Sequence, residues 1–354
     1  MSEQVKKRKK KRRLKGGTKV AIIIASVVLV VAALGGIGYG IYQNYYNKMN
    51  VEDSYVRTEF GRGMRRILAG DSGTLMHAEH VYNVLLIGHD SRVQGENRRS
   101  DSMILVSINE HTEEIVLTSI MRDSWVYIPG VGANKINEAY TLGGADKLIE
   151  TIEINFDVKI DNYAAVDFWA FMDIVDILGG VEMTITDLEV ENMLYYFHHE
   201  INPMLGRPLD TDVIEEGGTY VLNGAQALAF ARCRYVDSEA NRTGRQRELL
   251  AAIFEEVKDS DIGELTALLD AVLPYVTTDI SQDELLSLMM DFVAQYKDYE
   301  LVQYRVPYEG SYEVWYNDLT GIERYTLSVD IEANSAYMIQ NIYGVNVLEE
   351  ESDY

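Results

Sequence analysis

The chain has 354 residues, of which 47% are hydrophobic and only 5 are proline, so it can bury one large core or two small ones. Its net charge is −24 at pH 7, although ten of its 32 lysines and arginines lie in residues 1–19. The rest of the chain is therefore strongly acidic, which argues against a nucleic-acid partner because such a partner needs a broad basic face. A phosphate-bearing ligand would need a small local basic pocket instead.

The N-terminal region predicts a membrane anchor. The basic run 1–19 is followed by an uncharged apolar run, 20–41. A helix of that length spans about 33 Å, enough for a bilayer core of roughly 30 Å. The basic flank predicts a cytoplasmic N-terminus and an extracellular body. A cleaved signal peptide is the alternative, which the length of the apolar run disfavours. We expect a cytoplasmic segment at 1–19, a transmembrane helix at 20–42 and a stalk at 43–80.

Three apolar, strand-like runs follow in rapid succession: Asn83–Gly88, Met103–Asn109 and Glu114–Met121. The short connection between the second and third runs predicts an antiparallel hairpin. Charged residues appear where these runs begin or end, and strand ends hold side chains rigidly while leaving them open to ligands. These residues are Asp90, Arg99, Asp101, Arg122 and Asp123.

The carboxylates of Asp90 and Asp101 could hold a divalent ion. Hard oxygen ligands in a site that substrate phosphates complete are typical of Mg²⁺. The alternative is that both residues cap helices or hydrogen-bond their own loops, which is the usual role of isolated aspartates. Their proximity in sequence to Arg99 and Arg122 favours a site for a metal-bound phosphate.

The middle of the chain alternates between helical and strand patterns. Residues 167–178 carry apolar side chains at helical spacing, and Val181–Ile185 reads as a strand. Such alternation predicts a layered α/β domain. The aromatic stretch 193–205 has no clear period, so it either walls an apolar groove or packs as a loop against the body. Residues 258–354 are expected to add helices, a strand at Glu300–Val306 and an acidic tail.

Five arginines lie between positions 232 and 247. Arg232 and Arg234 are two apart, so on a strand they would share a face. Arg242 and Gln246 are four apart, so in the first turns of a helix they would share a face as well. Guanidinium groups suit bidentate contact with phosphate oxygens. The alternative is a set of surface ion pairs with the many acids of this chain. Cys233, the only cysteine, is expected to be a small buried strand residue.

Absent motifs narrow the choice of chemistry. The sequence contains no G-x-x-x-x-G-K-[ST] loop, no G-x-S-x-G elbow and no H-E-x-x-H pair. Nucleotide-driven phosphoryl transfer and hydrolysis by serine or zinc therefore lack their usual sequence support.

Several stretches together resemble the LytR-CpsA-Psr (LCP) proteins of Gram-positive bacterial envelopes. They occur in the family's order across 81–257 and read NVLLIGHDSR, RRSDSMILVSIN, LTSIMRD, KINEAY, DFWAFMDIVDILGGVE and ALAFARCRYVDSEANRTGRQR. The resemblance implies an α/β/α sandwich with a central mixed sheet and a hydrophobic tunnel for a polyprenyl chain. It makes 81–257 the catalytic core and 258–354 the part that completes the domain.

The resemblance also implies an activity. These proteins are thought to move an anionic glycopolymer, such as teichoic acid or capsule, from an undecaprenyl-pyrophosphate carrier to N-acetylmuramic acid of peptidoglycan, forming a phosphodiester. By this resemblance Asp90 and Asp101 would bind Mg²⁺, and Arg99, Arg122 and Glu239 would be catalytic. The implied pyrophosphate ligands are Arg99, Arg122, Arg232, Arg234, Arg242 and Gln246.

Two departures from the family pattern stand out. The usual S-I-P-R-D reads S-I-M-R-D at 119–123, which keeps Arg122. The usual aspartate of D-F-G-R is Glu239 here, so a proton-accepting carboxylate would have a longer reach. Two alternatives to transfer remain open: hydrolysis of the same lipid pyrophosphate, and a non-catalytic envelope protein that binds polyprenyl phosphates.

Overall fold

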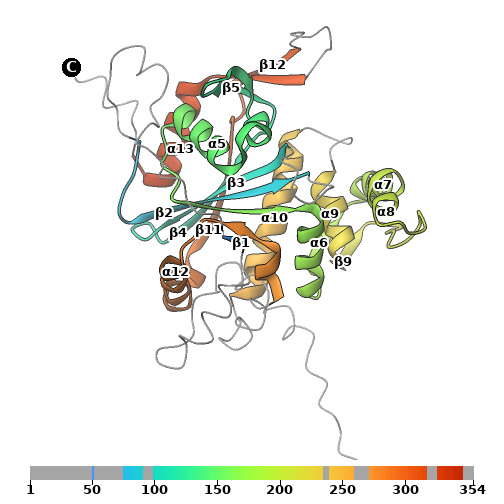
Figure 1. The fold of residues 1–354 in the computed structure, drawn as a ribbon. Helices are drawn as coiled ribbons and strands as arrows, with labels where there is room; N and C mark the ends of the chain where they lie inside the picture. Colours follow the sequence, from blue (N-terminus) through green and yellow to red (C-terminus); the bar gives the residue numbers. More distant parts are fainter. Residues whose placement is uncertain are drawn as a thin grey trace, which may run out of the picture.

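A computed structural model describes residues 50–51, 75–90, 99–233, 239–258, 271–316 and 325–345. The described chain is a mixed α/β structure built on a central sheet (Figure 1). The expected basic segment, the transmembrane helix at 20–42 and most of the stalk lie outside these residues. Within the described ranges, no helix combines the length and apolar character that crossing a bilayer requires.

The central sheet has seven strands in the order β1-β10-β7-β2-β3-β4-β11. The predicted hairpin is present, because β3 pairs antiparallel with both β2 and β4. β7 joins β2 and β11 joins β4 in parallel, so the sheet is mixed. In chain order the strands are β1 (Asn50–Val51), β2 (Val81–His89), β3 (Ser100–Asn109), β4 (Glu114–Ile120), β7 (Asn162–Asp167), β10 (Thr277–Thr278) and β11 (Glu300–Val306).

Helices cover both faces of this sheet. α5 (Glu138–Phe156) and α13 (Ile331–Tyr343) lie on one side, and α6 (Phe168–Ile177), α9 (Gly224–Arg232) and α10 (Glu239–Val257) lie on the other (Figure 1). Because successive side chains of a strand point to opposite faces, β3 contributes side chains to the hydrophobic cores on both sides of the sheet. Its Ile104 and Ile108 join the core of the α6–α10 side, while Met103 and Leu105 join the core of the α5–α13 side.

The aromatic stretch 193–205 does not form a loop. It continues α7 (Asp187–Tyr196) into a π-helical turn, η1 (Phe197–Ile201), and then into α8 (Asn202–Met204). A π-turn inserts a residue into the helical repeat, which explains why the sequence shows no regular period there. The π-turn packs against α9, while the hairpin of β8 (Val181–Ile185) and β9 (Gly218–Leu222) packs against α10 and α9.

A second sheet contains four strands in the order β12-β13-β5-β6. Its members are β5 (Ser124–Ile128), β6 (Gly132–Lys135), β12 (Tyr312–Tyr316) and β13 (Tyr325–Val329). The remaining elements are α12 (Gln282–Ala294) and two 3₁₀ turns, η2 (Leu273–Tyr275) and η3 (Tyr296–Asp298).

The expected strand at Arg232 and Cys233 is wrong. Asn223 and Gln226 form a capping box that starts α9, and the alanine-rich sequence carries the helix through Arg232. Cys233 is the C-cap residue of that helix and is fully buried. Arg232 is helical, and Arg234 lies outside the described residues.

Two glycines in adjoining helices are expected to respond oppositely to alanine. A Cβ at Gly224 would lie 2.2 Å from the Met172 carbonyl oxygen, where α9 crosses α6. We predict that Gly224→Ala destabilises the protein by about 1–3 kcal/mol, because a packed backbone must move. At Gly244 in α10 the nearest atom is 4.0 Å away, a side-chain nitrogen of Arg247.

The matched variant Gly244→Ala should therefore stabilise the protein by about 0.5–1 kcal/mol through helix propensity. Urea unfolding of the two variants and the wild type measures both effects. Equal stability of the two variants would contradict the close approach of α6 and α9.

Candidate active site

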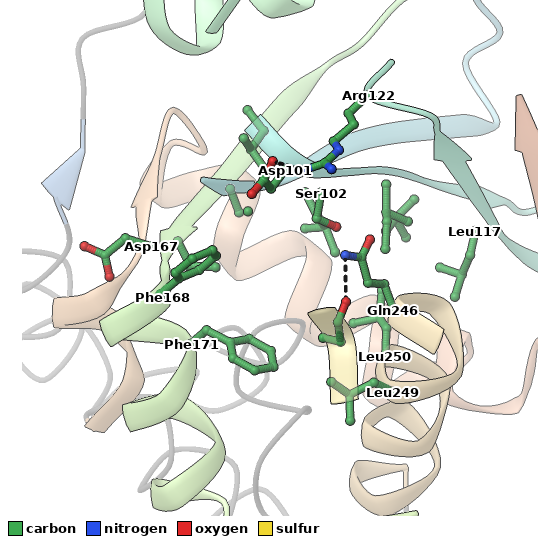
Figure 2. A pocket seen from close by; sticks show the side chains of 18 of the residues that line it. Asp101, Ser102, Leu117, Arg122, Asp167, Phe168, Phe171, Gln246, Leu249 and Leu250 are labelled. Carbon is green, nitrogen blue, oxygen red and sulfur yellow. Dashed lines mark hydrogen bonds and ion pairs between the residues drawn. The ribbon is translucent and has the colours of Figure 1, made fainter. Parts of the chain in front are cut away.

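A cavity of about 1410 Å³ lies between the central sheet and helices α6, α9 and α10. Its lining is charged at one end and apolar along most of its length. Figure 2 shows Asp101 and Arg122 at the charged end, and Phe171, Leu249 and Leu250 further along the cavity. A cavity of this size exceeds the roughly 300–1,000 Å³ of ordinary small-molecule sites, so it suits a long apolar ligand with one charged end.

The charged end is organised around an ion pair between β3 and the end of β4. Arg122 Nη1 donates to Asp101 Oδ1 at 2.5 Å, and Arg122 Nε lies 3.6 Å from Asp123 Oδ2. Asp123 in turn accepts a hydrogen bond from Lys135 Nζ at 2.7 Å. All four residues line the cavity. The charges alternate in sign along the wall, so each charged group has an oppositely charged partner beside the apolar space.

Asp101 is held in its ionised form. Burial alone would raise its pKa, but the nearby guanidinium groups of Arg122 and Arg242 outweigh burial and bring the pKa below its ordinary value. An ionised carboxylate is available to a cation or to a positively charged side chain. The negative charge at this position therefore persists throughout the physiological pH range.

Asp90 and Asp101 come to the same end of the cavity. The Asp90 amide donates to the Arg99 carbonyl at 3.3 Å, which holds the end of β2 against the start of β3, and both carboxylates line the cavity. Among the described residues, no three histidine, cysteine or acidic side chains form a metal-binding cluster. Two carboxylates suffice for Mg²⁺ when water and substrate phosphates supply its other ligands, so this donor set fits the expected ion.

Arg99 and Arg232 line the cavity, each held by an acid from another element. Arg99 pairs with Glu138 at the start of α5 at 2.5 Å, and its side chain is 55% exposed. Arg232 pairs with Glu200 of the π-turn at 2.5 Å. Its guanidinium also lies over the ring of Phe168, 4.5 Å from the centroid. Stacking on an aromatic face orients a guanidinium without consuming its donors.

α10 contributes Arg242 and Gln246 to the cavity, on the shared face that their spacing predicts. Arg242 is buried, and Gln246 Nε2 donates to the Ala231 carbonyl at 3.2 Å, the dashed contact in Figure 2. The Ser119 hydroxyl donates to the Thr243 carbonyl at 3.5 Å, which joins the start of α10 to β4. The first turns of α10 thus sit beside the strand end that carries Arg122.

The five arginines between positions 232 and 247 do not all line the cavity. Arg245 points away from the cavity, where it is buried against Glu189 at 2.7 Å and the Cys233 carbonyl at 3.0 Å. Arg247 is also absent from the lining. Arg234 is outside the described residues. Glu239 is the first residue of α10, and its side chain is likewise outside what the structure describes.

Three ion pairs in this site were not predicted from the sequence, although Lys135 and Glu138 belong to the KINEAY stretch. Glu138 and Glu200 are two acids among 56, and their roles emerge only when α5 and the π-turn are packed beside Arg99 and Arg232. The third is the pairing of Lys135 with Asp123 across neighbouring strands. Glu138, Glu200 and Asp123 each pair with a guanidinium or ammonium group that would otherwise be available to a phosphate.

Comparison with known proteins identifies the family. The family model described as "LytR_cpsA_psr family" matches residues 42–347, which is most of the chain. The chain belongs to this family. The expected family and mixed α/β fold are thereby confirmed.

Relatives and solved structures agree with this assignment. The chain is 32% identical over 274 residues to the polyisoprenyl-teichoic acid–peptidoglycan teichoic acid transferase TagU of Halalkalibacterium halodurans, covering 75% of this chain and 82% of the relative. The solved structure "TagT bound to LI-WTA" superposes with a TM-score of 0.60 and 26% identity, covering 83% of this chain and all of that one. A TagT structure with bound octaprenyl pyrophosphate lipid shares the fold, with a TM-score of 0.56 at 24% identity over 83% of this chain and all of that one.

The ion pair of Asp101 predicts a pH-dependent loss of stability. Because the folded-state pKa of Asp101 is lowered, its carboxylate stabilises the fold above the unfolded-state pKa and ceases to do so as pH falls through the folded-state value. We predict that Asp101→Asn costs about 1–3 kcal/mol at pH 7, and that this difference shrinks below about pH 4.

Denaturant unfolding from pH 3 to 8 measures this difference. Asp146→Asn is the matched control, because Asp146 is an exposed acid of α5. A destabilisation of Asp101→Asn that stays constant down to pH 3 would contradict the role of its charge.

Proposed function

We propose that the chain is a membrane-anchored glycopolymer phosphotransferase. It moves an anionic polymer, such as a teichoic acid or a capsular glycan, from an undecaprenyl-pyrophosphate carrier to N-acetylmuramic acid of peptidoglycan. The observation that carries this proposal is a continuous cavity that is apolar along most of its length and arginine-rich at one end. Relatives named as polyisoprenyl-teichoic acid–peptidoglycan transferases support it.

The apolar length of the cavity suits a polyprenyl chain. Its walls are aliphatic and aromatic side chains from the central sheet, α6 and α10, including Val106, Phe171 and Leu249. Burying such a chain is favourable by about 0.8 kcal/mol for each CH₂ removed from water. Burial of the apolar prenyl chain would thus hold the lipid in the cavity. Its pyrophosphate would remain at the arginines, because moving the charged group into the apolar part of the cavity is unfavourable.

The charged end of the cavity suits the pyrophosphate group of the lipid carrier, which is the group that reacts. In the proposed reaction an acceptor hydroxyl oxygen bonds to the sugar-linked phosphorus, and the bond from that phosphorus to the bridging oxygen breaks. The lipid phosphate leaves with the electron pair, and the hydroxyl proton passes to a base. Arg122, Arg232 and Arg242 would bind the phosphate oxygens and stabilise the charge that develops on the leaving group. Glu239 stays the expected proton acceptor.

The proposed function also includes a bound Mg²⁺ ion at the charged end of the cavity. Asp90 and Asp101 would hold it, and the bound ion would neutralise phosphate charge next to the arginines. The pairing of Asp101 with Arg122 keeps that carboxylate ionised and oriented towards the cavity.

We further propose that residues 20–42 anchor the protein in the cell membrane, with residues 1–19 in the cytoplasm and the catalytic domain outside. The anchor would keep the cavity close to its lipid substrate and so raise the effective concentration of that lipid. The uncharged run and its basic flank in the sequence support this topology.

Blocking the cavity should separate lipid binding from phosphate binding. Val106 lines the cavity from β3, far in sequence from the arginines of α9 and α10. We predict that Val106→Trp lowers affinity for undecaprenyl pyrophosphate at least about tenfold, since the loss of two buried CH₂ groups already exceeds 1.4 kcal/mol. Affinity for inorganic pyrophosphate should stay unchanged.

Isothermal titration of both ligands provides the measurement, with Val221→Trp as control. Val221 is 54% exposed on β9 and does not line the cavity. Unaltered lipid affinity of Val106→Trp would show that the chain binds its lipid elsewhere.

The transferase assignment itself is tested by turnover. The protein would be incubated with lipid-linked oligosaccharide, Mg²⁺ and uncrosslinked peptidoglycan. Glycan linked to peptidoglycan would then be quantified by mass spectrometry. We predict that Arg122→Ala lowers the rate about 10²–10³-fold, because a donor aimed at developing charge is lost. Arg207→Ala is the matched control, since Arg207 pairs with Asp212 and does not line the cavity.

The same assay separates the alternatives. Release of lipid phosphate without linked glycan would identify a hydrolase. Tight lipid binding without turnover across several donor glycans would identify a non-catalytic lipid-binding protein. Either result would overturn the proposed function.

A further inference from the structure

Arg247 is a half-buried arginine that the candidate active site does not use. It belongs to α10 but does not line the cavity. Its Nε and Nη1 atoms are buried, and neither has a hydrogen-bond partner among the residues that the structure describes. Within that part of the chain, Arg247 is the only residue with two such atoms. A buried charged donor without an acceptor is unfavourable, so these two nitrogens suit an acceptor that a ligand supplies.

A second arginine, Arg305 of β11, lies on the same side of the central sheet. Arg305 and Leu301 are four residues apart on one strand and so share a face, and Leu301 lines the cavity. Arg305 is in register with Ser119 of β4, whose hydroxyl donates to the Thr243 carbonyl of α10. Arg247 follows Thr243 by four residues and so shares its face of the helix. The two arginines therefore converge where α10 packs on β4 and β11.

The two guanidinium groups are close enough to influence each other. Burial lowers the pKa of Arg247, and the positive charge of Arg305 lowers it further. Arg305 Nη2 pairs with Glu309 at 2.7 Å, but the Glu309 side chain is 82% exposed. Arg305 Nη1 faces the Met121 sulfur at 4.0 Å, which is a weak acceptor. An oxyanion between the two arginines would accept hydrogen bonds from both and offset the repulsion of their charges.

We propose that Arg247 and Arg305 form a second oxyanion site, beside the charged end of the cavity, which binds a phosphate group of the donor polymer. The site is separate from the pyrophosphate ligands, because neither arginine lines the cavity. The polymer as the source of the phosphate rests on the proposed function. The oxyanion site itself rests only on the two arginines.

The position of the site favours the polymer over a lipid surface. Met121, which Arg305 contacts, directly precedes Arg122, so the site adjoins the place where the reacting pyrophosphate would lie. An anionic polymer attached to that pyrophosphate would bring its own phosphate groups close to this place. A membrane surface presents many anionic headgroups and is attracted by a cluster of basic residues. Here the exposed acids Glu248 and Glu309 flank the two arginines, which suits a single phosphate group instead.

The oxyanion site is tested by isothermal titration with inorganic phosphate while geranylgeranyl pyrophosphate saturates the cavity. We predict that Arg247→Gln and Arg305→Gln each weaken phosphate binding about tenfold, because one charge-assisted hydrogen bond is lost. The affinity for geranylgeranyl pyrophosphate should not change. Arg207→Gln is the matched control, because Arg207 is also half-buried but pairs with Asp212 and lies outside the cavity lining.

The source of the phosphate is tested with lipid-free poly(glycerol phosphate) as a second probe. Both glutamine variants should bind this polymer about tenfold more weakly than the wild type, and Arg247→Lys should retain more of the affinity because it keeps the charge. In the transfer assay, Arg247→Gln should raise the KM for a lipid-linked donor whose glycan carries phosphate. The KM for a lipid-linked oligosaccharide without phosphate in its glycan should not change. A merely structural role of Arg247 would alter both KM values alike.

Circular dichroism and thermal unfolding verify that each variant is folded. Weaker binding of phosphate and of the polymer by both glutamine variants supports the inference, even if no transfer is detected and the proposed function alone fails.

Three results would overturn the inference while leaving the proposed function intact. The first is wild-type affinity for inorganic phosphate in both glutamine variants. The second is a loss of binding to phosphatidylglycerol vesicles with unchanged polymer binding, which would assign the site to a lipid headgroup. The third is weaker binding of inorganic phosphate with unchanged polymer binding, which would assign the site to free phosphate.

Discussion

The ion pair between Arg122 and Asp101 is the constraint on which the site depends. An apolar cavity this large can carry charge at one end only if each charge has a partner, because an unpaired buried charge costs several kcal/mol. The alternating series Asp101, Arg122, Asp123 and Lys135 meets that requirement with residues from β3, the end of β4 and β6. It fixes guanidinium and carboxylate groups at the cavity end before any ligand arrives, so little reorganisation is required on binding.

The surrounding packing explains how the charged end is held while the cavity stays open. α6 and α9 approach closely at Gly224, and α10 is joined to β4 through Ser119 and Thr243. The contact between Ser119 and Thr243 lies at the charged end, whereas Gly224 lies at the opposite end of α9 from Arg232. The guanidinium of Arg232 is held in place by stacking on Phe168 and by its ion pair with Glu200 of the π-turn. An incoming phosphate would compete with Glu200 for that guanidinium.

Local patterns predicted much of this arrangement. The strands that carry Asp90, Asp101 and Arg122 could be placed because short apolar runs end sharply at charged residues, and Arg242 and Gln246 could be paired because helical spacing is local. The strand expected at Arg232 was wrong because a capping box and a run of alanines extend α9 to that point. The partners Glu138 and Glu200 could not be predicted, since only tertiary packing brings them near their arginines. The same holds for the second sheet, in which β13 pairs with β5 although the two strands are far apart in the sequence.

The central claim is that one cavity holds the lipid along its apolar length and the pyrophosphate at its charged end. A crystal structure of the protein with geranylgeranyl pyrophosphate bound tests this claim most directly. The account predicts phosphate oxygens within hydrogen-bonding distance of Arg122, Arg232 and Arg242, with the prenyl chain between α6 and α10 against Phe171 and Leu249. A prenyl chain bound outside the cavity, or a pyrophosphate remote from these arginines, would contradict it.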